Sequence, residues 1–446
     1  MKVRGIPHEN DSSFYPDCRD SPHSYSIRQD LCFGRAEDRY NAKKSQQCNS
    51  VTTLNVDDQY RDQRSVKRNM SGDKPSLFLG YDINDPRHLD PVREWQPHGR
   101  QTIKTLEWWY VNGLLYDAEK NPYFFVWAPL HMVGEKNLPP GTPNVLPGYR
   151  CVLAVVGFAD YHNKLTINDT DVGFMNETNI WDPGRNELCF EIPSGLSMPP
   201  EHPADFTSKW SYDGKLMDLQ VSSPHLSFNN LHFTGGQRVL YARDKRHKKE
   251  GLIQQGSRLD WSYYYSLPGL SVTGQIKYTD DNNKEHVIDV EGKAWVDRQW
   301  GDFTTVWWEW SCLLFDSGAR ADLYSFCNDY KVGSYQKDDG LTQWFDCFTL
   351  ERHSYIPTPA GKWLSWGWTY EFEDVDIEGS RHYTLNPWSK KDVHDSFYSF
   401  FEGPSYLIND ETGEQVGYAV TESMDILNMR NGPVAPRDKG LGLYPP

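Results

Sequence analysis

The residues most able to do chemistry are acids set among aromatic rings in the stretch 291–326. Its acids include Asp297, Asp302 and Glu309, and its tryptophans are Trp295, Trp300, Trp307, Trp308 and Trp310. A carboxylate beside indole rings on a half-buried strand is costly unless it has a charged partner or takes up a proton. Asp297 therefore either forms a structural ion pair, with Arg298 or a more distant arginine, or is held partly protonated for proton transfer. Composition alone favours the ion pair, because structural pairs are common.

The elements around these acids are predicted to be strands rich in aromatic and β-branched residues. We expect strands at 287–296 and 306–315, a turn at Asp316, Ser317 and Gly318, and a hairpin feeding a third strand at 321–326. Alternation along a strand sorts side chains onto two faces. One face carries Asp297 together with Lys293, Trp295 and Gln299. The other face carries Arg298 together with Ala294, Val296 and Trp300.

Two further groups of residues could take part in chemistry. Glu107 lies in the run LEWWY and, by strand parity, shares a face with Trp109 and Val111. It could equally be an acceptor that ties down a neighbouring strand. The phenols at 263–265 precede Ser-Leu-Pro, and the sequence favours core and rim packing for them over a pocket. Together these groups suit a large apolar substrate, because aromatic faces stabilise positive charge and a desolvated carboxyl can transfer a proton.

Composition indicates an all-β chain with large aromatic cores. The 446 residues include 28 Pro, 34 Gly, 17 Trp and 26 Tyr, and long helical periodicity is scarce. The first clear hairpin joins 102–117 to 123–132 through the turn at 118–121. Two β-series of similar length predict two β-domains side by side. The expected divisions are a polar N-terminal extension (1–75), a first β-domain (76–240), a basic linker (241–257), a second β-domain (258–430) and a tail (431–446).

Several classes of protein are disfavoured. The net charge of −16 argues against a nucleic-acid-binding surface. No apolar run is long enough to span a membrane, and the first residues carry no apolar signal core, so we expect a cytoplasmic protein whose eight scattered cysteines are reduced. The basic run at 245–249 is expected to be solvated, with contact to an anionic substrate or a membrane surface as the alternative. Motifs for zinc proteases, serine hydrolases and nucleotide binding are absent, and we predict no metal and no cofactor.

Four motifs resemble one family in their order and spacing. They are LEWWYVNG (106–113), YSLP (265–268), GKAWVDRQWGDF (292–303) and FFEGP…GYAVTE (400–422). The sequence is similar in these motifs to the hydroxyneurosporene synthase (carotenoid 1,2-hydratase)/AttH-like family, over roughly 75–425. The resemblance implies two lipocalin-like antiparallel β-barrel domains packed together around a hydrophobic pocket. The family includes hydratases that add water to a terminal alkene without a cofactor, and fungal Diels–Alderases that form decalins.

The resemblance also implies roles for individual residues. Asp297 matches the aspartate expected to protonate the alkene, whereas Trp295 stands where the hydratases tend to carry Tyr, and 263–265 fall where they carry His and Trp. Glu107 and Trp109 match the first-domain signature. The resulting expectation is a cofactor-free hydratase or cyclase of isoprenoid or polyene metabolism. Its catalytic residues would be Asp297, Glu107 and Tyr264, and its substrate would contact Trp109, Tyr265, Trp295, Trp300, Trp308 and Trp310.

Two alternatives from other functional classes stay open. A pericyclase would need shape and hydrogen bonds to hold the reactive conformer, and no proton donor. A carrier would bind an apolar ligand without chemistry, as lipocalin-type barrels often do. In all three cases the expected partner is a large apolar small molecule, with no nucleic acid and no integral membrane segment, and transient membrane contact stays open.

Overall fold

The computed structural model describes residues 78–424 apart from gaps at 81–84, 135–137, 139–147, 194–195, 199–204, 236–237, 245–248, 255–259, 304–307, 327–329, 359–361 and 396–398. The described residues all belong to one compact unit, Gln46–Pro446. The predicted N-terminal extension (1–75), the tail (431–446) and most of the basic run lie outside the described residues. We find no helix in the described part of the chain that combines the length and apolarity needed to cross a bilayer.

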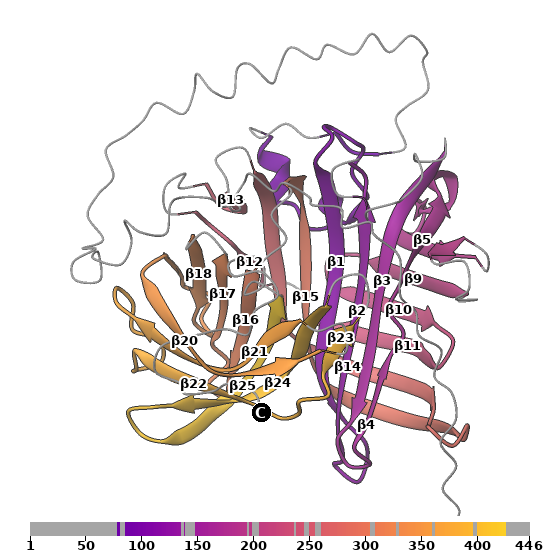
Figure 1. Cartoon of the computed structure of the whole chain (residues 1–446). Helices are drawn as coiled ribbons and strands as arrows, with labels where there is room; N and C mark the ends of the chain where they lie inside the picture. The colour runs from indigo at the N-terminus through magenta and orange to yellow at the C-terminus, as the bar shows by residue number, and fades with distance from the viewer. Residues whose placement is uncertain are drawn as a thin grey trace, which may run out of the picture. The chain divides into compact units, whose positions relative to one another are not determined.

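The described chain forms two antiparallel sheets, which confirms the expected all-β class (Figure 1). The first sheet contains β1 (Thr105–Tyr116), β2 (Pro122–Met132), β3 (Tyr149–Asp160), β4 (Leu165–Asn168), β5 (Asp171–Asn176), β6 (Trp181–Asp182), β7 (Glu187–Ile192), β8 (Ser197–Met198), β9 (Phe206–Tyr212), β10 (Leu216–Ser222), β11 (Leu226–Thr234), β12 (Leu240–Tyr241), β13 (Leu252–Gln254), β14 (Trp261–Thr279) and β15 (Glu285–Asp302). Its main path runs β6-β7-β9-β10-β11-β14-β15-β1-β2-β3-β5-β8.

The second sheet follows along the chain. It contains β16 (Trp308–Phe315), β17 (Arg320–Phe326), β18 (Lys331–Gln336), β19 (Thr342–Phe345), β20 (Phe348–Pro357), β21 (Trp363–Phe372), β22 (His382–Pro387), β23 (Val393–Asp395), β24 (Ser399–Asn409) and β25 (Glu414–Met424). Its main path runs β19-β18-β17-β16-β25-β24-β22-β21-β20. The helices described are short 3₁₀ turns: η2 (Pro86–Leu89), η3 (Arg93–Trp95) and η5 (Glu177–Asn179).

The strand pairing agrees with the sequence in one hairpin and differs in another. The β1–β2 hairpin forms as predicted, with Lys120 in the turn at φ 66°. The turn at Gly318, with φ 88°, closes the hairpin between β16 and β17. However, β15 does not pair with β16. It lies between β14 and β1 in the first sheet, whereas β16 lies between β17 and β25 in the second. The chain therefore changes sheets between Asp302 and Trp308.

This change of sheet also bears on the predicted domains. The sequence places β14 and β15 in the second β-domain, which begins at 258. Both strands are hydrogen-bonded within the first sheet, to β11 and β1 respectively. The local pattern of apolar and polar residues predicts where strands lie. It does not predict to which sheet each strand belongs, because that depends on pairing with strands far away in the chain.

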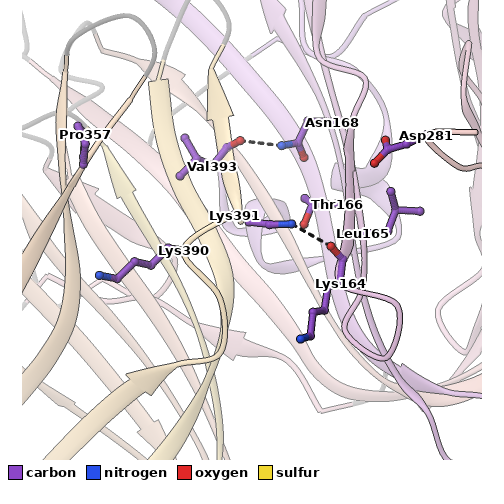
Figure 2. Close-up of a pocket in the computed structure, with 9 residues that line it drawn as sticks. All are labelled: Lys164, Leu165, Thr166, Asn168, Asp281, Pro357, Lys390, Lys391 and Val393. Atoms are coloured by element: carbon purple, nitrogen blue, oxygen red, sulfur yellow. Dashed lines mark hydrogen bonds between the residues drawn. The ribbon is translucent and has the colours of Figure 1, made fainter. Parts of the chain in front are cut away.

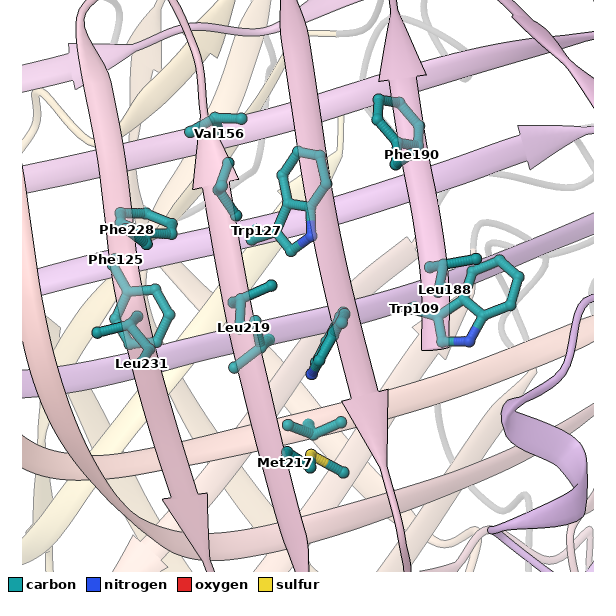
Figure 3. Packing of buried hydrophobic residues seen from close by; sticks show 14 of the residues in the cluster. Trp109, Phe125, Trp127, Val156, Leu188, Phe190, Met217, Leu219, Phe228 and Leu231 are labelled. Carbon is teal, nitrogen blue, oxygen red and sulfur yellow. The ribbon is translucent and has the colours of Figure 1, made fainter. Parts of the chain in front are cut away.

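Three cores follow from the alternation of these strands. The first core lies on one face of the first sheet and includes Trp109, Phe125, Trp127 and Phe190 (Figure 3). The third core lies within the second sheet, around Trp368. The second core combines residues of both sheets: Trp108, Tyr110 and Trp295 from the first, and Trp308, Trp310, Cys312, Tyr324 and Phe400 from the second. The second core is therefore where the two sheets meet.

Candidate active site

Asp297 projects from β15 toward the second core. Only 3% of the residue is exposed, and the Nε1–H of Trp295 donates to Asp297 Oδ1 at 2.5 Å. Burial raises the pKa of Asp297 to about 7, although hydrogen bonds from Ser266, Tyr264 and Trp295 partly offset this effect. A buried carboxyl without a counter-charge favours its neutral form in this way.

Arg298 does not supply the counter-charge that the ion-pair interpretation requires. Its side chain lies on the opposite face of β15, and its Nη2 donates to Glu107 Oε2 at 2.7 Å. No ion pair of Asp297 is found among the described residues. The geometry therefore favours the second interpretation of the sequence, an acid that can hold a proton near neutral pH.

Asp322 brings a second carboxyl from the other sheet. It lies on β17 and is fully buried. Its Oδ1 accepts from the Nε1–H of Trp310 at 2.7 Å and from the hydroxyl of Tyr264 at 3.4 Å. Its Oδ2 has no hydrogen-bond partner among the described residues. Burial, and then the charge of Asp297, raise the pKa of Asp322 well above its usual range.

Tyr264 connects the two aspartates. It lies on β14 and is fully buried, and its hydroxyl oxygen accepts from Ser266 Oγ at 2.9 Å while it donates to Asp322. Ser266 and Tyr264 also lower the pKa of Asp297, so both hydroxyls lie close to it. A single phenol thus contacts a carboxyl from each sheet, so a proton can pass between the two without entering water.

Glu402 and Glu422 complete a group of four carboxyls, hereafter the acid cluster (Asp297, Asp322, Glu402 and Glu422). The two glutamates are direct partners in the β24–β25 register. The hydroxyl of Tyr110 donates to Glu402, and Trp308 Nε1–H donates to Glu422 Oε2 at 3.0 Å. Burial raises the pKa of Glu422 to about 7, and burial followed by the charge of Glu422 raises that of Glu402 well above its usual range. Glu402 is buried, whereas Glu422 keeps partial exposure.

Aromatic rings surround the acid cluster, with Trp310 among them. The centroid of Trp310 lies 5.5 Å from Tyr110, 6.3 Å from Trp295 and 6.4 Å from Tyr324. Within the described residues, no arginine or lysine forms an ion pair with any member of the acid cluster. Ring faces attract positive charge, and uncompensated carboxyls near neutral pKa exchange protons. The arrangement therefore provides proton transfer next to surfaces that stabilise a cation.

The opposite face of the first sheet carries a different kind of network. Glu107 accepts from Arg298 at 2.7 Å and from Arg150 Nη1 at 3.0 Å, and its oxygens also take the backbone N–H of His98. Burial is the largest influence on the pKa of Glu107 and would raise it, but the charge of Arg298 together with the interactions of His131 and His98 holds this pKa well below its usual range. The Arg298 guanidinium lies 3.7 Å from the ring centroid of Trp109. The Glu107 carboxylate is therefore ionised, and both of its oxygens accept hydrogen bonds.

The structure divides the predicted site residues between these two faces. It brings together Asp297, Tyr264, Trp295, Trp308 and Trp310 in the second core or at its edge. It places Glu107, Trp109, Tyr265 and Trp300 on the other face, in or beside the first core. The sequence did not single out Asp322, Glu402, Tyr110 or Tyr324 for this site. Each of them is a polar residue in a strand rich in apolar side chains, which the sequence shows, but only the pairing of distant strands shows that they converge.

One group of buried residues has the composition of a metal site. His88, Glu94 and His98 offer ligand atoms within 4.8 Å of one another. His98 Nδ1 lies 3.2 Å from Arg298 Nη2 and 3.3 Å from Glu107 Oε2. His98 Nε2 forms a hydrogen bond with Glu94 Oε2 at 2.7 Å. A metal would have to displace this bond, so the geometry fits a hydrogen-bond network better than a metal centre.

A second such group contains Asp346, Cys347 and Asp374. Cys347 is disulfide-bonded, so it has no free thiolate to offer a metal. The expectation that the cysteines are reduced is therefore wrong at Cys347. Cys151, Cys189 and Cys312 are free thiols.

A surface pocket lies away from the acid cluster. It has a volume of about 370 Å³ and is lined by Lys164, Leu165, Thr166, Asn168, Asp281, Pro357, Lys390, Lys391 and Val393. Figure 2 shows two bonds that join the sheets here: Lys391 Nζ donates to the carbonyl of Lys164 at 3.0 Å, and Asn168 Nδ2 donates to that of Val393 at 2.6 Å. None of its residues belongs to the acid cluster, so this pocket is not the candidate active site.

Comparison with known families supports the resemblance seen in the motifs. The family model described as AttH-like matches residues 204–420. Over this range the chain is similar to AttH-like proteins. The AttH-like range contains Asp297, Asp322 and Glu402 and ends just before Glu422. A search of the curated proteins finds no significant match.

Among solved structures, an AttH protein from Nitrosomonas europaea is similar with a TM-score of 0.54 and 16% identity, covering 71% of this chain and 91% of that one. This similarity supports the fold alone. Kievitone hydratase from Nectria haematococca has a TM-score of 0.47 and 12% identity, over 71% and 87% of the two chains. A protein named CghA has a TM-score of 0.44 and 10% identity, over 72% and 88%.

Proposed function

We propose that this protein is a cofactor-independent enzyme that performs acid–base chemistry on a large apolar substrate at the acid cluster. The observation that carries the proposal is Asp297, a carboxyl that is almost fully buried, forms no ion pair in the described part of the chain and has a pKa of about 7. A group with such a pKa exchanges protons readily at neutral pH, which is what general acid–base catalysis requires.

The surroundings of Asp297 support an apolar substrate. The groups around the acid cluster are mainly indole and phenol rings, and the amides of Asn112 and Gln299 bond to two of these phenols, Tyr110 and Tyr324. Protonation of an alkene creates a carbocation, and the rings of Trp295 and Trp310 offer the faces that stabilise positive charge. Capture of that cation by water gives hydration, and capture by a second alkene of the same molecule gives cyclisation. We propose an isoprenoid or polyene substrate for this reason.

The first experiment is extraction of the purified protein with organic solvent, followed by mass spectrometry of the extract. The second incubates the protein with any co-purified compound, and with acyclic terpenoid and polyene alkenes in detergent micelles, in deuterium oxide. Addition of a proton to carbon places solvent deuterium on the product. A pericyclic reaction gives a product without deuterium, and a carrier returns the compound unchanged, so either result would refute the proposal.

Variants then connect the chemistry to the site. Asp297→Asn should lower turnover by about 10²- to 10⁴-fold, the usual contribution of a general acid or base. Asp302→Asn is the matched control, because Asp302 lies on the same strand and its pKa is also raised by burial, to about 6, but it bonds to Thr105 instead of facing the acid cluster. Full activity of Asp297→Asn would remove Asp297 from the mechanism.

A further inference from the structure

We infer that Asp322 is a second catalytic residue: at neutral pH it carries a proton on Oδ2 and gives it to the substrate, while Asp297 is the carboxylate that receives a proton in return. This inference rests on the proposed function, because it assigns the acid and the base within the same site. It differs from what the family resemblance implies, which makes Asp297 the donor.

The hydrogen bonds of the two aspartates differ, and this difference decides which one is ionised. Asp297 accepts from Trp295 at 2.5 Å, and neither of its oxygens is among the described buried atoms that lack a hydrogen-bond partner. Asp322 accepts from Trp310 at 2.7 Å and only distantly from Tyr264, at 3.4 Å, with both bonds on Oδ1. Hydrogen bonds from donors stabilise a carboxylate. Asp297 is therefore the better anion of the two.

The free oxygen of Asp322 shows where a proton belongs. Asp322 is fully buried and its Oδ2 has no partner among the described residues. A buried carboxylate oxygen without a donor is costly, and a proton on that oxygen removes the cost. The resulting O–H has no acceptor among the described residues, so it is available to an incoming substrate. The raised pKa of Asp322 is consistent with this assignment.

The groups around Asp322 do not oppose this protonation state. The titratable groups that interact with it are Asp297 on β15, Tyr264 on β14, Tyr324 on its own strand, Cys312 on β16 and Tyr370 on β21. None of them is a cation. Two carboxyls this close keep at least one proton between them over a wide pH range. Asp297 and Asp322 therefore form an acid and a base that are supplied by different sheets.

The proposed cycle balances in atoms and charge. The O–H bond of Asp322 breaks as a C–H bond forms on the alkene, which leaves a carbocation beside Trp310. A water oxygen bonds to that carbon and releases one proton to the Asp297 carboxylate. Asp297 then returns its proton to the Tyr264 oxygen as the Tyr264 hydroxyl proton passes to Asp322 Oδ1, and rotation of the Asp322 carboxyl brings this proton to the outer position and restores the starting state. In a cyclisation, Asp297 would take a proton from carbon instead.

The first test needs no substrate. Infrared spectra of the wild type, Asp322→Asn and Asp297→Asn at pH 8 report the carbonyl band of protonated carboxyl groups. We expect Asp322→Asn to lose part of this band and Asp297→Asn to retain it. Loss of the band in Asp297→Asn, with retention in Asp322→Asn, would overturn the assignment.

A second variant keeps the test valid if Asp322→Asn does not fold. Trp295→Phe leaves both carboxyls in place and removes the indole donor from Asp297. Carbon-13 NMR of aspartate-labelled protein should show two carboxyls that titrate near pH 7 in the wild type, those of Asp297 and Asp392, and only that of Asp297 should move upward in Trp295→Phe. It should also show another that stays protonated past pH 8. A wild type in which no buried carboxyl stays protonated at pH 8 would refute the inference.

The kinetic test separates this inference from the proposed function. If Asp297 is the base, turnover should rise with pH through about 7, because Asp297 must be ionised. If Asp297 were the acid, turnover would fall over the same range, and the roles assigned here would be wrong. Absence of turnover with every alkene would instead refute the proposed function and the catalytic role of Asp322, while the infrared result on its proton would stand.

Discussion

Replacing Asp297 with Asn should make the protein relatively more stable at alkaline pH. The pKa of Asp297 rises from its ordinary value of 3.8 to about 7 on folding, chiefly because of burial. Between these two values the folded chain keeps a proton that the unfolded chain releases, so stability falls as pH rises through this window. Each pKa unit corresponds to about 1.4 kcal/mol, and the penalty at high pH is therefore about 4 kcal/mol.

Asn carries no such penalty, and its carbonyl can still accept from Trp295. Relative to the wild type, the free energy of unfolding of Asp297→Asn should increase by about 2 to 3 kcal/mol between pH 5 and pH 8. Comparing the two pH values cancels any constant loss of hydrogen bonding.

The assay is urea denaturation of both proteins at pH 5, 6, 7 and 8. Asp281→Asn is the control, because it makes the same chemical change at an exposed aspartate. The reasoning would be refuted by a flat difference for Asp297→Asn. A decreasing difference would refute it more strongly, since it would mean that the carboxylate is ionised and stabilised in the fold.

Three other substitutions test the surroundings of the site. Glu107→Gln should cost about 3 to 5 kcal/mol, because it leaves two buried arginines without their carboxylate, and urea denaturation should find the same loss at pH 5 and pH 8; a pH-dependent loss would contradict the lowered pKa. Gly113→Ala should cost about 1 to 3 kcal/mol by thermal denaturation, because a Cβ there would lie 2.4 Å from the Phe125 ring; an unchanged melting temperature would show that the ring moves aside freely. Glu422→Gln should lower the pKa of Glu402, which the charge of Glu422 raises, and carbon-13 NMR would show no change if the two carboxyls did not interact.

The alternation of side chains along a strand correctly predicted which face of β15 each residue occupies. It placed Asp297 with Trp295 and Arg298 with Trp300 on opposite faces of one strand, and the structure has this division. Parity also separated Glu107 from Tyr110. Parity is local, because successive side chains point to opposite sides of any strand. These assignments therefore needed no knowledge of the fold.

The partners of those faces could not be predicted in the same way. Asp322 lies 25 residues from Asp297 in the sequence. The sequence predicted one continuous set of hairpins here, and this prediction did not show that the strands of the two aspartates belong to different sheets. Glu402 reaches the site only because β24 pairs with β25, and β25 with β16. Such contacts depend on long-range pairing, which the periodicity of a single strand does not encode.

The neighbouring positions of Asp297 and Arg298 have a consequence for how β15 finds its place. In the β1–β15 register, Asp297 lies opposite Tyr110 and Arg298 opposite Trp109. A slip by one residue would exchange the faces, so that the guanidinium would leave Glu107 and the carboxylate of Asp297 would approach it. Like charges would then meet in a region closed to water. Electrostatic repulsion therefore disfavours the shifted register of β15, in addition to the effect of the pattern of apolar side chains.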